Sequence, residues 1–235
     1  MFVRCRAMVM DGDGTPTKDG KMVGAVVDAL KRLRNADCRL ILATGESMEE
    51  LSDFPNIDLF CAVVAEEGAV VCCPKGEDEQ QLAPAPPSTL IARLREKGVD
   101  PLRLGRVIIS TEEPHEKNLR DTIEELALDY VIHRNRKQRM ALPAGIDKGY
   151  GIATLLERFH IPRAEVIGIG DAENDRSLFA VCGLKVAVAN ALGELKQFAD
   201  IVTRGEQGYG VAELIDNLLE GGRSPLFQVP LGSCN

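Results

Sequence analysis

The sequence lacks an excess of basic residues, a hydrophobic run long enough for a membrane span, and a signal-peptide pattern. Its 28 Lys and Arg face 36 Asp and Glu, which gives a formal net charge of -8. Because nucleic acids and anionic membrane surfaces attract basic faces, neither is expected as a partner. No apolar stretch reaches the roughly 18 residues of a membrane span. The short run that ends at Met10 carries Arg4 and Arg6, so no signal peptide is expected.

The seven cysteines do not form a recognisable framework. Their number is odd, and Cys72 and Cys73 are adjacent, which suits neither a zinc knuckle nor a CxxC redox pair. Cys5, Cys38 and Cys61 lie at or beside apolar runs, where cysteine usually packs as a small hydrophobe. Unpaired cysteines are typical of a reducing compartment, so a cytoplasmic protein is expected.

Short apolar runs alternate with helical patterns along most of the chain. Fully apolar strands that are joined through helices are typical of a parallel sheet covered on both faces. The pattern therefore predicts an α/β fold with a Rossmann-like parallel sheet. The expected strands are residues 7–10, 39–43, 61–65, 166–169, 186–188 and, as a short addition, 201–202.

The middle of the chain has a different pattern. Residues 74–87 contain four prolines and an acidic run, which is typical of a loop or a domain boundary. The following helical and strand patterns predict that residues 74–145 form a small α+β domain. This domain would be inserted into an α/β core made of residues 1–73 and 146–220. Residues 221–235 are rich in Gly, Ser and Pro, and we expect a disordered tail there.

An acidic turn directly follows the first predicted strand. Asp11 and Asp13 are separated and followed by glycines, and two close carboxylates can form a hard-cation site and a nucleophile platform. A plain surface turn is the simpler interpretation, because Asp-Gly pairs are common in turns. A calcium loop is rejected, since it would require Gly where Pro16 stands and Glu where Met22 stands.

Three further segments also follow strand ends or begin a helix. In open α/β sheets, ligands bind at the carboxyl ends of the strands, so these segments are expected near the acidic turn. A hydroxyl beside a free backbone N–H can hold a phosphoryl oxygen, a lysine can offset phosphate charge, and a dense acidic cluster needs a cation. The three segments are Thr44-Gly45, Asp147-Lys148-Gly149 and Gly170-Asp171-Ala172-Glu173-Asn174-Asp175.

Taken in this order, the four segments resemble the motifs of the haloacid dehalogenase (HAD) superfamily. An N-terminal DxDGT, a Thr-Gly strand end, a Lys and then GDxxND cover the predicted core. Residues 186–191, 199–203 and 208–210 also resemble the end of its Cof-type branch, which carries a cap between the second and third motifs. The insert at 74–145 matches that placement, and its short length is similar to the archaeal phosphoglycolate phosphatase and sucrose-phosphatase relatives.

The resemblance implies a magnesium-dependent phosphatase that acts on a small phosphorylated metabolite. Asp11 would be the nucleophile that forms a phospho-aspartate, and Asp13 the general acid and base. Thr44, with Gly45, would hold a phosphoryl oxygen, and Lys148 would stabilise the intermediate. The implied Mg²⁺ ligands and their supports are Asp11, Asp13, Asp171, Asn174 and Asp175.

Two positions depart from the family pattern, and one cluster lies outside it. Relatives usually have Leu where this chain has Pro16 and Arg where it has Glu46. The basic cluster at residues 134–139 could turn towards an anionic substrate if the inserted domain closes over the core, so Arg139 is a candidate substrate-binding residue. Two alternatives stay open: a phosphomutase of the same superfamily, and a partner-binding module whose catalytic site is impaired.

Overall fold

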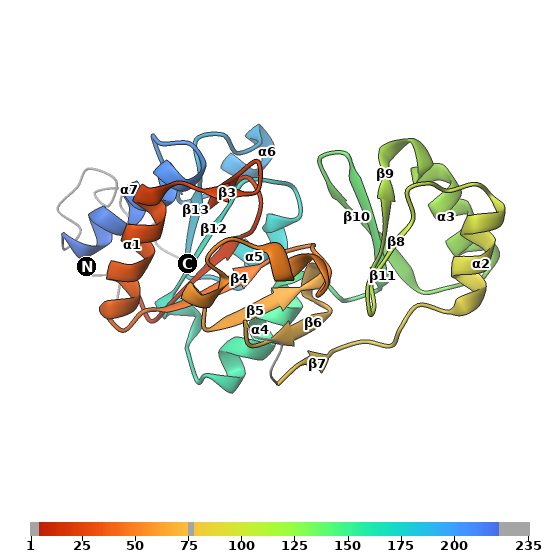
Figure 1. Ribbon diagram of the computed structural model, residues 1–235, viewed down its shortest axis with the longest axis horizontal. Helices are drawn as coiled ribbons and strands as arrows, with labels where there is room; N and C mark the ends of the chain where they lie inside the picture. The colour runs from red at the N-terminus through yellow and green to blue at the C-terminus, as the bar shows by residue number, and fades with distance from the viewer. Residues whose placement is uncertain (1–4, 75–77, 221–235) are drawn as a thin grey trace, which may run out of the picture.

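An eight-stranded sheet forms the larger of two bodies in this computed structural model, which describes residues 5–74 and 78–220 (Figure 1). The strand order is β14-β13-β12-β1-β4-β5-β6-β7. The predicted tail at 221–235 lies outside the described residues. The strands are β1 (Ala7–Asp11), β4 (Arg39–Ala43), β5 (Ala62–Ala65), β6 (Val70–Cys72), β7 (Gln80–Gln81), β12 (Val166–Gly170), β13 (Leu184–Ala187) and β14 (Ile201–Val202).

Strand β1 lies near the centre of this sheet, at the point where the order of strand addition switches from one side to the other. The chain continues from β1 to β4 and β5 on one side, and it later adds β12, β13 and β14 on the other side, all in parallel. Asp11 is level with Ala43 of β4, and Met10 is level with Ile169 of β12. The residues that follow β1, β4 and β12 therefore meet at one edge of the sheet, at its topological switch point.

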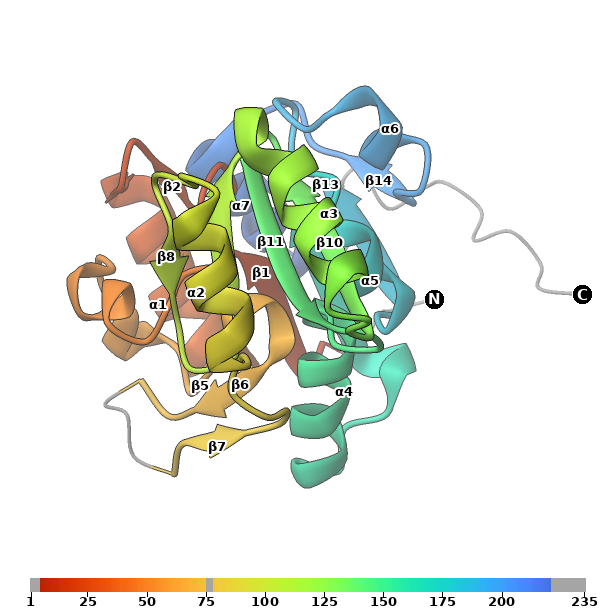
Figure 2. The same cartoon turned by 90° about the vertical axis from the view of Figure 1, so that its right-hand side faces the viewer.

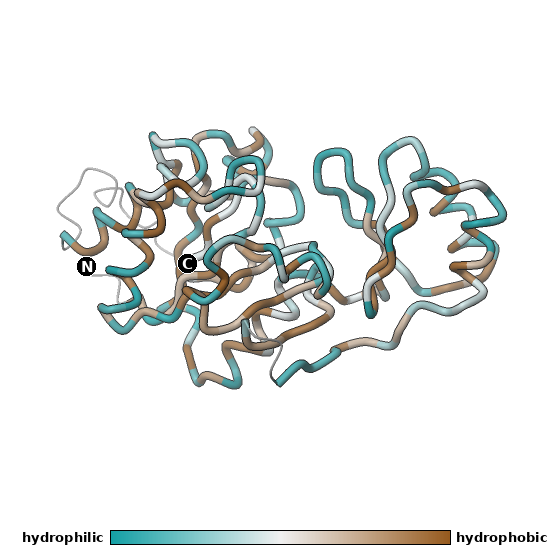
Figure 3. The backbone as a smooth tube through the Cα atoms, viewed as in Figure 1, coloured by the Kyte–Doolittle hydropathy of each residue, from teal (hydrophilic) through white to brown (hydrophobic). Residues whose placement is uncertain are grey.

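The core strands form because nearly every residue in them is apolar and buried. All five residues of β1 are buried, and Figure 3 shows the core strands mainly in brown. Helix α1 (Gly24–Asn35) buries Val26, Ala29, Leu30 and Leu33, which recur at helical spacing along one face. It packs against α7 (Gln207–Leu219), while α4 (Lys148–Arg158) packs against α5 (Asp175–Ala180). None of the described helices has the length and hydropathy that crossing a bilayer requires.

The smaller body is a cap that extends from α2 to β11. Its four-stranded antiparallel sheet has the order β10-β11-β9-β8. In Figure 1 this sheet lies towards the core, and Figure 2 shows α2 and α3 on the outer side of the cap. The cap elements are α2 (Ser88–Glu96), β8 (Arg103–Leu104), β9 (Ile109–Glu112), α3 (Glu116–Glu125), β10 (Tyr130–Asn135) and β11 (Gln138–Pro143). The cap has its own apolar centre, built around Leu90, Leu94, Ile109 and Leu119.

Short elements complete the chain. A two-stranded hairpin follows the acidic turn, and helix α6 precedes β14. Single 3₁₀ turns connect several of the longer elements. These pieces are β2 (Thr17–Lys18), β3 (Lys21–Met22), α6 (Gly193–Lys196) and the 3₁₀ turns η1 (Glu50–Asp53), η2 (Ile57–Leu59), η3 (Glu66–Gly68), η4 (Glu113–His115) and η5 (Arg163–Glu165).

The α/β fold class with a parallel-dominated sheet is confirmed, and the structure adds detail at the sheet edge. Strands β6 and β7 run antiparallel beyond β5. Strand β7 falls inside the range 74–145 that was assigned to the inserted domain, yet it pairs with the core sheet. Residues 107–109 are all apolar, as in a buried strand, but β9 begins only at Ile109, and Val107 and Ile108 pack between the cap and the core.

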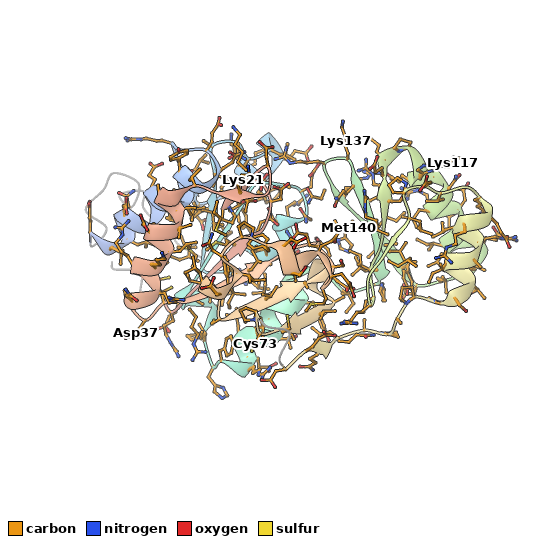
Figure 4. The ribbon with its side chains drawn as sticks, viewed as in Figure 1. Lys21, Asp37, Cys73, Lys117, Lys137 and Met140 are labelled. Carbon is orange, nitrogen blue, oxygen red and sulfur yellow. The ribbon has the colours of Figure 1, made fainter. Side chains whose placement is uncertain are left out.

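The contact between cap and core combines an apolar cluster with one buried carboxylate. Ala69 of the core packs with Val107, Ile108 and Met140 of the cap, and Figure 4 shows Met140 at this boundary. Beside them, the fully buried carboxylate of Glu66 accepts three backbone N–H groups from the cap, those of residues 106, 107 and 108, at 2.9, 2.8 and 3.1 Å. Charge-assisted hydrogen bonds of this kind are stronger than neutral ones, so Glu66 links the two bodies firmly.

Replacing Glu66 with Gln is expected to lower the free energy of unfolding by about 1–3 kcal/mol. The amide keeps the size of the side chain, but it loses the charge and turns an NH₂ donor towards backbone N–H donors. Urea denaturation of Glu66→Gln and of the exposed control Glu157→Gln measures this difference. Equal midpoints and slopes for both variants would show that the three hydrogen bonds do not hold the cap.

Candidate active site

Three neighbouring strand ends bring the predicted site residues together. Asp11 ends β1 and is 3% exposed, Thr44 follows β4 and is 4% exposed, and Asp171 follows β12 and is fully buried. A Cβ added at Gly12 would lie 3.1 Å from the Thr44 hydroxyl, so the acidic turn and the Thr-Gly turn are in close contact. This edge of the sheet thus holds a carboxylate, a hydroxyl and a second carboxylate at adjacent positions.

Lys148 enters this group from the first turn of α4. The side chain of Asp147 caps that helix by accepting the Tyr150 N–H at 2.9 Å. This cap fixes the start of α4 and therefore the position of Lys148. The Lys148 ammonium is fully buried and donates to Asp11 Oδ1 and, at 2.7 Å, to Asp175 Oδ1. Burial alone would lower the pKa of Lys148, but Asp11, Asp175 and Glu67 together raise it well above its usual value, so the lysine stays charged.

Asp175 organises the loop after β12. Its Oδ2 atom accepts the backbone N–H groups of Asp171 at 2.8 Å and Ala172 at 3.0 Å, while Oδ1 is bound by Lys148. Both oxygens are therefore engaged within the protein. Asp175 sets the positions of Asp171 and Lys148 more directly than it offers a free ligand.

Three buried carboxylates form the candidate metal centre. Oxygen atoms of Asp11, Asp171 and Asp175 lie within 4.8 Å of one another. Burial, together with the charge of Asp175, raises the pKa values of both Asp11 and Asp171 above their usual range. Because a divalent cation would relieve this repulsion and prefers carboxylate oxygens, the donor set fits Mg²⁺.

The surroundings of Asp171 also fit a cation. A Cβ added at Gly14 would lie only 2.5 Å from Asp171 Oδ2, so glycine keeps space open beside this carboxylate. Asp171 Oδ1 accepts the Thr15 hydroxyl at 2.9 Å, and Oδ2 accepts the guanidinium of Arg136 from the cap. A positive group already balances this carboxylate in the structure, which shows that the position favours positive charge.

A cavity of about 560 Å³ lies between this edge of the core and the cap. Asp11, Asp13, Thr44 and Gly45 line its core side. Asp13 is exposed and accepts the Thr17 hydroxyl at 3.3 Å, so its carboxylate is accessible where Asp11 is enclosed. The Thr44 hydroxyl oxygen accepts the Glu46 N–H at 3.1 Å, which leaves its own proton free for a ligand. The two aspartates thus have different environments, as a nucleophile and an acid require.

The cap side of the cavity is lined by the hairpin between β10 and β11, and this changes one assignment. Arg136 and Lys137 line the cavity, and Figure 4 shows Lys137 at the tip of the hairpin. Arg139 was expected to bind substrate, but it is only 5% exposed and is absent from the cavity wall. Its guanidinium bonds Glu116 and the carbonyl oxygens of Arg136 and Gln138, so it holds the hairpin in shape.

Asn174 and Glu67 form a buried pair beside the lysine. Asn174 Nδ2 donates to Glu67 Oε2 at 3.0 Å, and Asn174 faces a different cavity from the one that Asp11 lines. Burial raises the pKa of Glu67, and the charge of Lys148 opposes that rise. Sequence analysis did not place Glu67 in the site; its only signal was a pair of acids, Glu66 and Glu67, directly after an apolar strand.

Comparison with known proteins identifies the family. The haloacid dehalogenase-like hydrolase family matches residues 94–215. Phosphoglycolate phosphatase 2 of Saccharolobus solfataricus is 40% identical over 118 residues, so the match covers 50% of this chain and only 49% of that protein. Phosphoglycolate phosphatase of Methanothermobacter thermautotrophicus is 30% identical over 223 residues, which are 89% of this chain and 97% of that protein.

The solved structures agree with this result at the level of the fold. A HAD/COF-like hydrolase from Plasmodium vivax superposes with a TM-score of 0.79 at 20% identity, covering 93% of this chain and 96% of that chain. The sequence matches extend across both the core and the cap. The chain therefore belongs to the haloacid dehalogenase-like hydrolase family and groups with that family's phosphatases.

Proposed function

We propose that this protein hydrolyses phosphomonoesters of small metabolites through a covalent phospho-aspartate at Asp11 and with Mg²⁺ as cofactor. The observation that carries the proposal is the position of the Asp11 carboxylate. It ends the central strand, it is bound by the buried Lys148, and it lies beside the Asp171 carboxylate at the wall of a cavity that Asp13 and Thr44 also line. A phosphomonoester with a sugar-sized or smaller leaving group fits a cavity of about 560 Å³ that the cap closes.

In the first step, an oxygen of Asp11 attacks phosphorus, and the bond from phosphorus to the leaving oxygen breaks. Asp13 donates a proton to that oxygen, so an alcohol departs. In the second step, Asp13 takes a proton from water and the resulting hydroxide attacks phosphorus. The bond between phosphorus and the Asp11 oxygen breaks, which releases inorganic phosphate and regenerates the Asp11 carboxylate. The Thr44 hydroxyl holds a phosphoryl oxygen, and Lys148 balances the charge of Asp11 throughout.

Asp11, Asp171 and the main-chain carbonyl of Asp13 would hold Mg²⁺, with Asp175 and Asn174 as supports. When bound, the cation neutralises the repulsion between an anionic nucleophile and an anionic phosphate. The partner is accordingly a small phosphorylated metabolite, such as a sugar phosphate or a phosphoglycolate-like ester, rather than nucleic acid or a membrane. A cytoplasmic location is part of the same proposal.

Removal of metal provides the direct test. EDTA is expected to reduce phosphate release from a panel of phosphorylated metabolites to background, and excess Mg²⁺ to restore it. Beryllium fluoride with Mg²⁺, which mimics a phospho-aspartate, is expected to raise the melting temperature. Product analysis of the same reactions distinguishes the alternatives: an isomerised ester without free phosphate would indicate a phosphomutase, and no turnover with no beryllium fluoride effect would indicate a binding module.

A further inference from the structure

On the core wall of the active-site cavity, one acidic side chain has a buried oxygen with no hydrogen-bond partner among the described residues. Glu46 follows the Thr44-Gly45 turn and lines the cavity together with Asp13. Its backbone is held at both ends of the residue: its N–H donates to Thr44 Oγ1 at 3.1 Å, and its carbonyl accepts the Glu66 N–H at 3.0 Å. The side chain of Glu46 therefore starts from a fixed point beside the group that would hold the phosphate.

The neighbouring Glu50 shows what a satisfied carboxylate looks like in this segment. Glu50 Oε2 accepts both the backbone N–H and the hydroxyl of Ser47, at 2.8 and 2.9 Å. By contrast, Glu46 Oε2 is buried and has no hydrogen-bond partner within residues 5–74 and 78–220. A buried acceptor without a partner is costly, so this oxygen is suited to a donor that arrives with a ligand.

The charges around Glu46 make the core wall unfavourable for a second anion. Three acidic residues, Asp13, Glu46 and Glu50, lie together on the core wall of the cavity. The cations that line the cavity, Arg103, Arg136 and Lys137, all come from the cap wall. A carboxylate held next to Glu46 would therefore meet negative charge, whereas a hydroxyl group would meet an acceptor.

We propose that Glu46 selects phosphomonoesters whose leaving group presents a hydroxyl near the ester carbon, as in polyol and sugar phosphates, and disfavours those that present a carboxylate there. This inference rests on the proposed phosphatase function and narrows its substrate class.

Two matched pairs of esters test the inference. Hydroxyethyl phosphate and phosphoglycolate differ in a hydroxymethyl group against a carboxylate, and glycerol phosphate and phosphoglycerate differ in the same way. The wild-type protein is expected to prefer the hydroxyl member of each pair in kcat/KM by about tenfold or more. Glu46→Gln is expected to reduce this ratio several-fold, mainly through a lower KM for the carboxylate ester. Glu46→Arg is expected to invert it.

Glu49→Gln serves as the matched control, because it removes the same charge from an exposed position in the same segment. It is expected to keep the wild-type ratio. If Glu46→Gln changes both members of a pair by the same factor, or if the wild-type protein prefers the carboxylate esters, the inference is overturned. Nitrophenyl phosphate distinguishes failure of this inference from failure of the proposed function. If the protein hydrolyses this ester but Glu46→Gln keeps the wild-type ratio of hydroxyl to carboxylate esters, only the role of Glu46 is rejected. If the wild-type protein hydrolyses no ester at all, the proposed function is rejected.

Discussion

Replacing Asp11 with Asn is expected to lower phosphate release by at least about a thousandfold. The amide has nearly the same shape as the carboxylate, but it cannot attack phosphorus. The fold should tolerate the change, because burial and the charge of Asp175 already raise the pKa of Asp11 and make its ionised form costly. Asn removes one of the mutually repelling charges and leaves Lys148 bound to Asp175. The melting temperature without metal is therefore expected to stay equal or to rise.

Steady-state phosphate release and thermal melting measure the two effects separately. Asp28→Asn is the matched control, since it removes a carboxylate from an exposed position on α1 and should retain wild-type turnover. Asp13→Asn offers a second comparison: it should slow turnover and still allow a phosphoryl group to reach Asp11 from an ester with a good leaving group. If Asp11→Asn releases phosphate at the wild-type rate, Asp11 is not the nucleophile.

Much of the core was predictable because its determinants are local. Strands such as β1 and β4 are short runs of apolar residues, and each ends at a polar turn. Once such strands are parallel, their carboxyl ends share one edge of the sheet. The sequence order of Asp11, Thr44 and Asp171 was therefore enough to expect them together, and the structure brings them together.

The contacts between cap and core were not predictable, because they join residues far apart in the sequence. The cluster at 134–139 identified a basic hairpin but not which of its side chains faces the cavity. That choice depends on Arg136, which has φ of 50° at the hairpin tip, and on Glu116 of α3, which engages Arg139 from another element. Neither feature leaves a local pattern in the sequence.

The same limit explains why the contacts of Glu66 and Val107 between cap and core were not predicted from the sequence. A buried carboxylate satisfied by three backbone N–H groups about forty residues away appears in the sequence only as one more acid. The apolar pair at residues 107–108 fits a strand equally well by its composition, yet it lies just before β9 and packs against the core. Interfaces between two bodies use the same apolar residues as strands, so composition alone does not separate them.

The positive charge of Lys148 contributes both to the proposed chemistry and to the stability of the core. Lys148→Met preserves much of the length of the side chain but leaves Asp11 and Asp175 buried without their cation. Breaking a buried ion pair from one side typically costs about 3–5 kcal/mol, and we expect a loss of this size in the free energy of unfolding in EDTA. Phosphate release should fall by about a hundredfold or more, because the charge of the attacking carboxylate is no longer balanced.

Denaturant unfolding in EDTA and in Mg²⁺ measures this loss, and Lys31→Met, at an exposed position of α1, is the control. Because Mg²⁺ bound by Asp11 and Asp171 would supply part of the missing positive charge, the loss should be smaller with the cation than with EDTA. Adding Asp175→Asn to Lys148→Met should recover part of the stability, since it removes one uncompensated carboxylate, but it should not recover turnover. Wild-type stability of Lys148→Met in EDTA would show that the Lys148 ammonium does not stabilise the fold through Asp11 and Asp175.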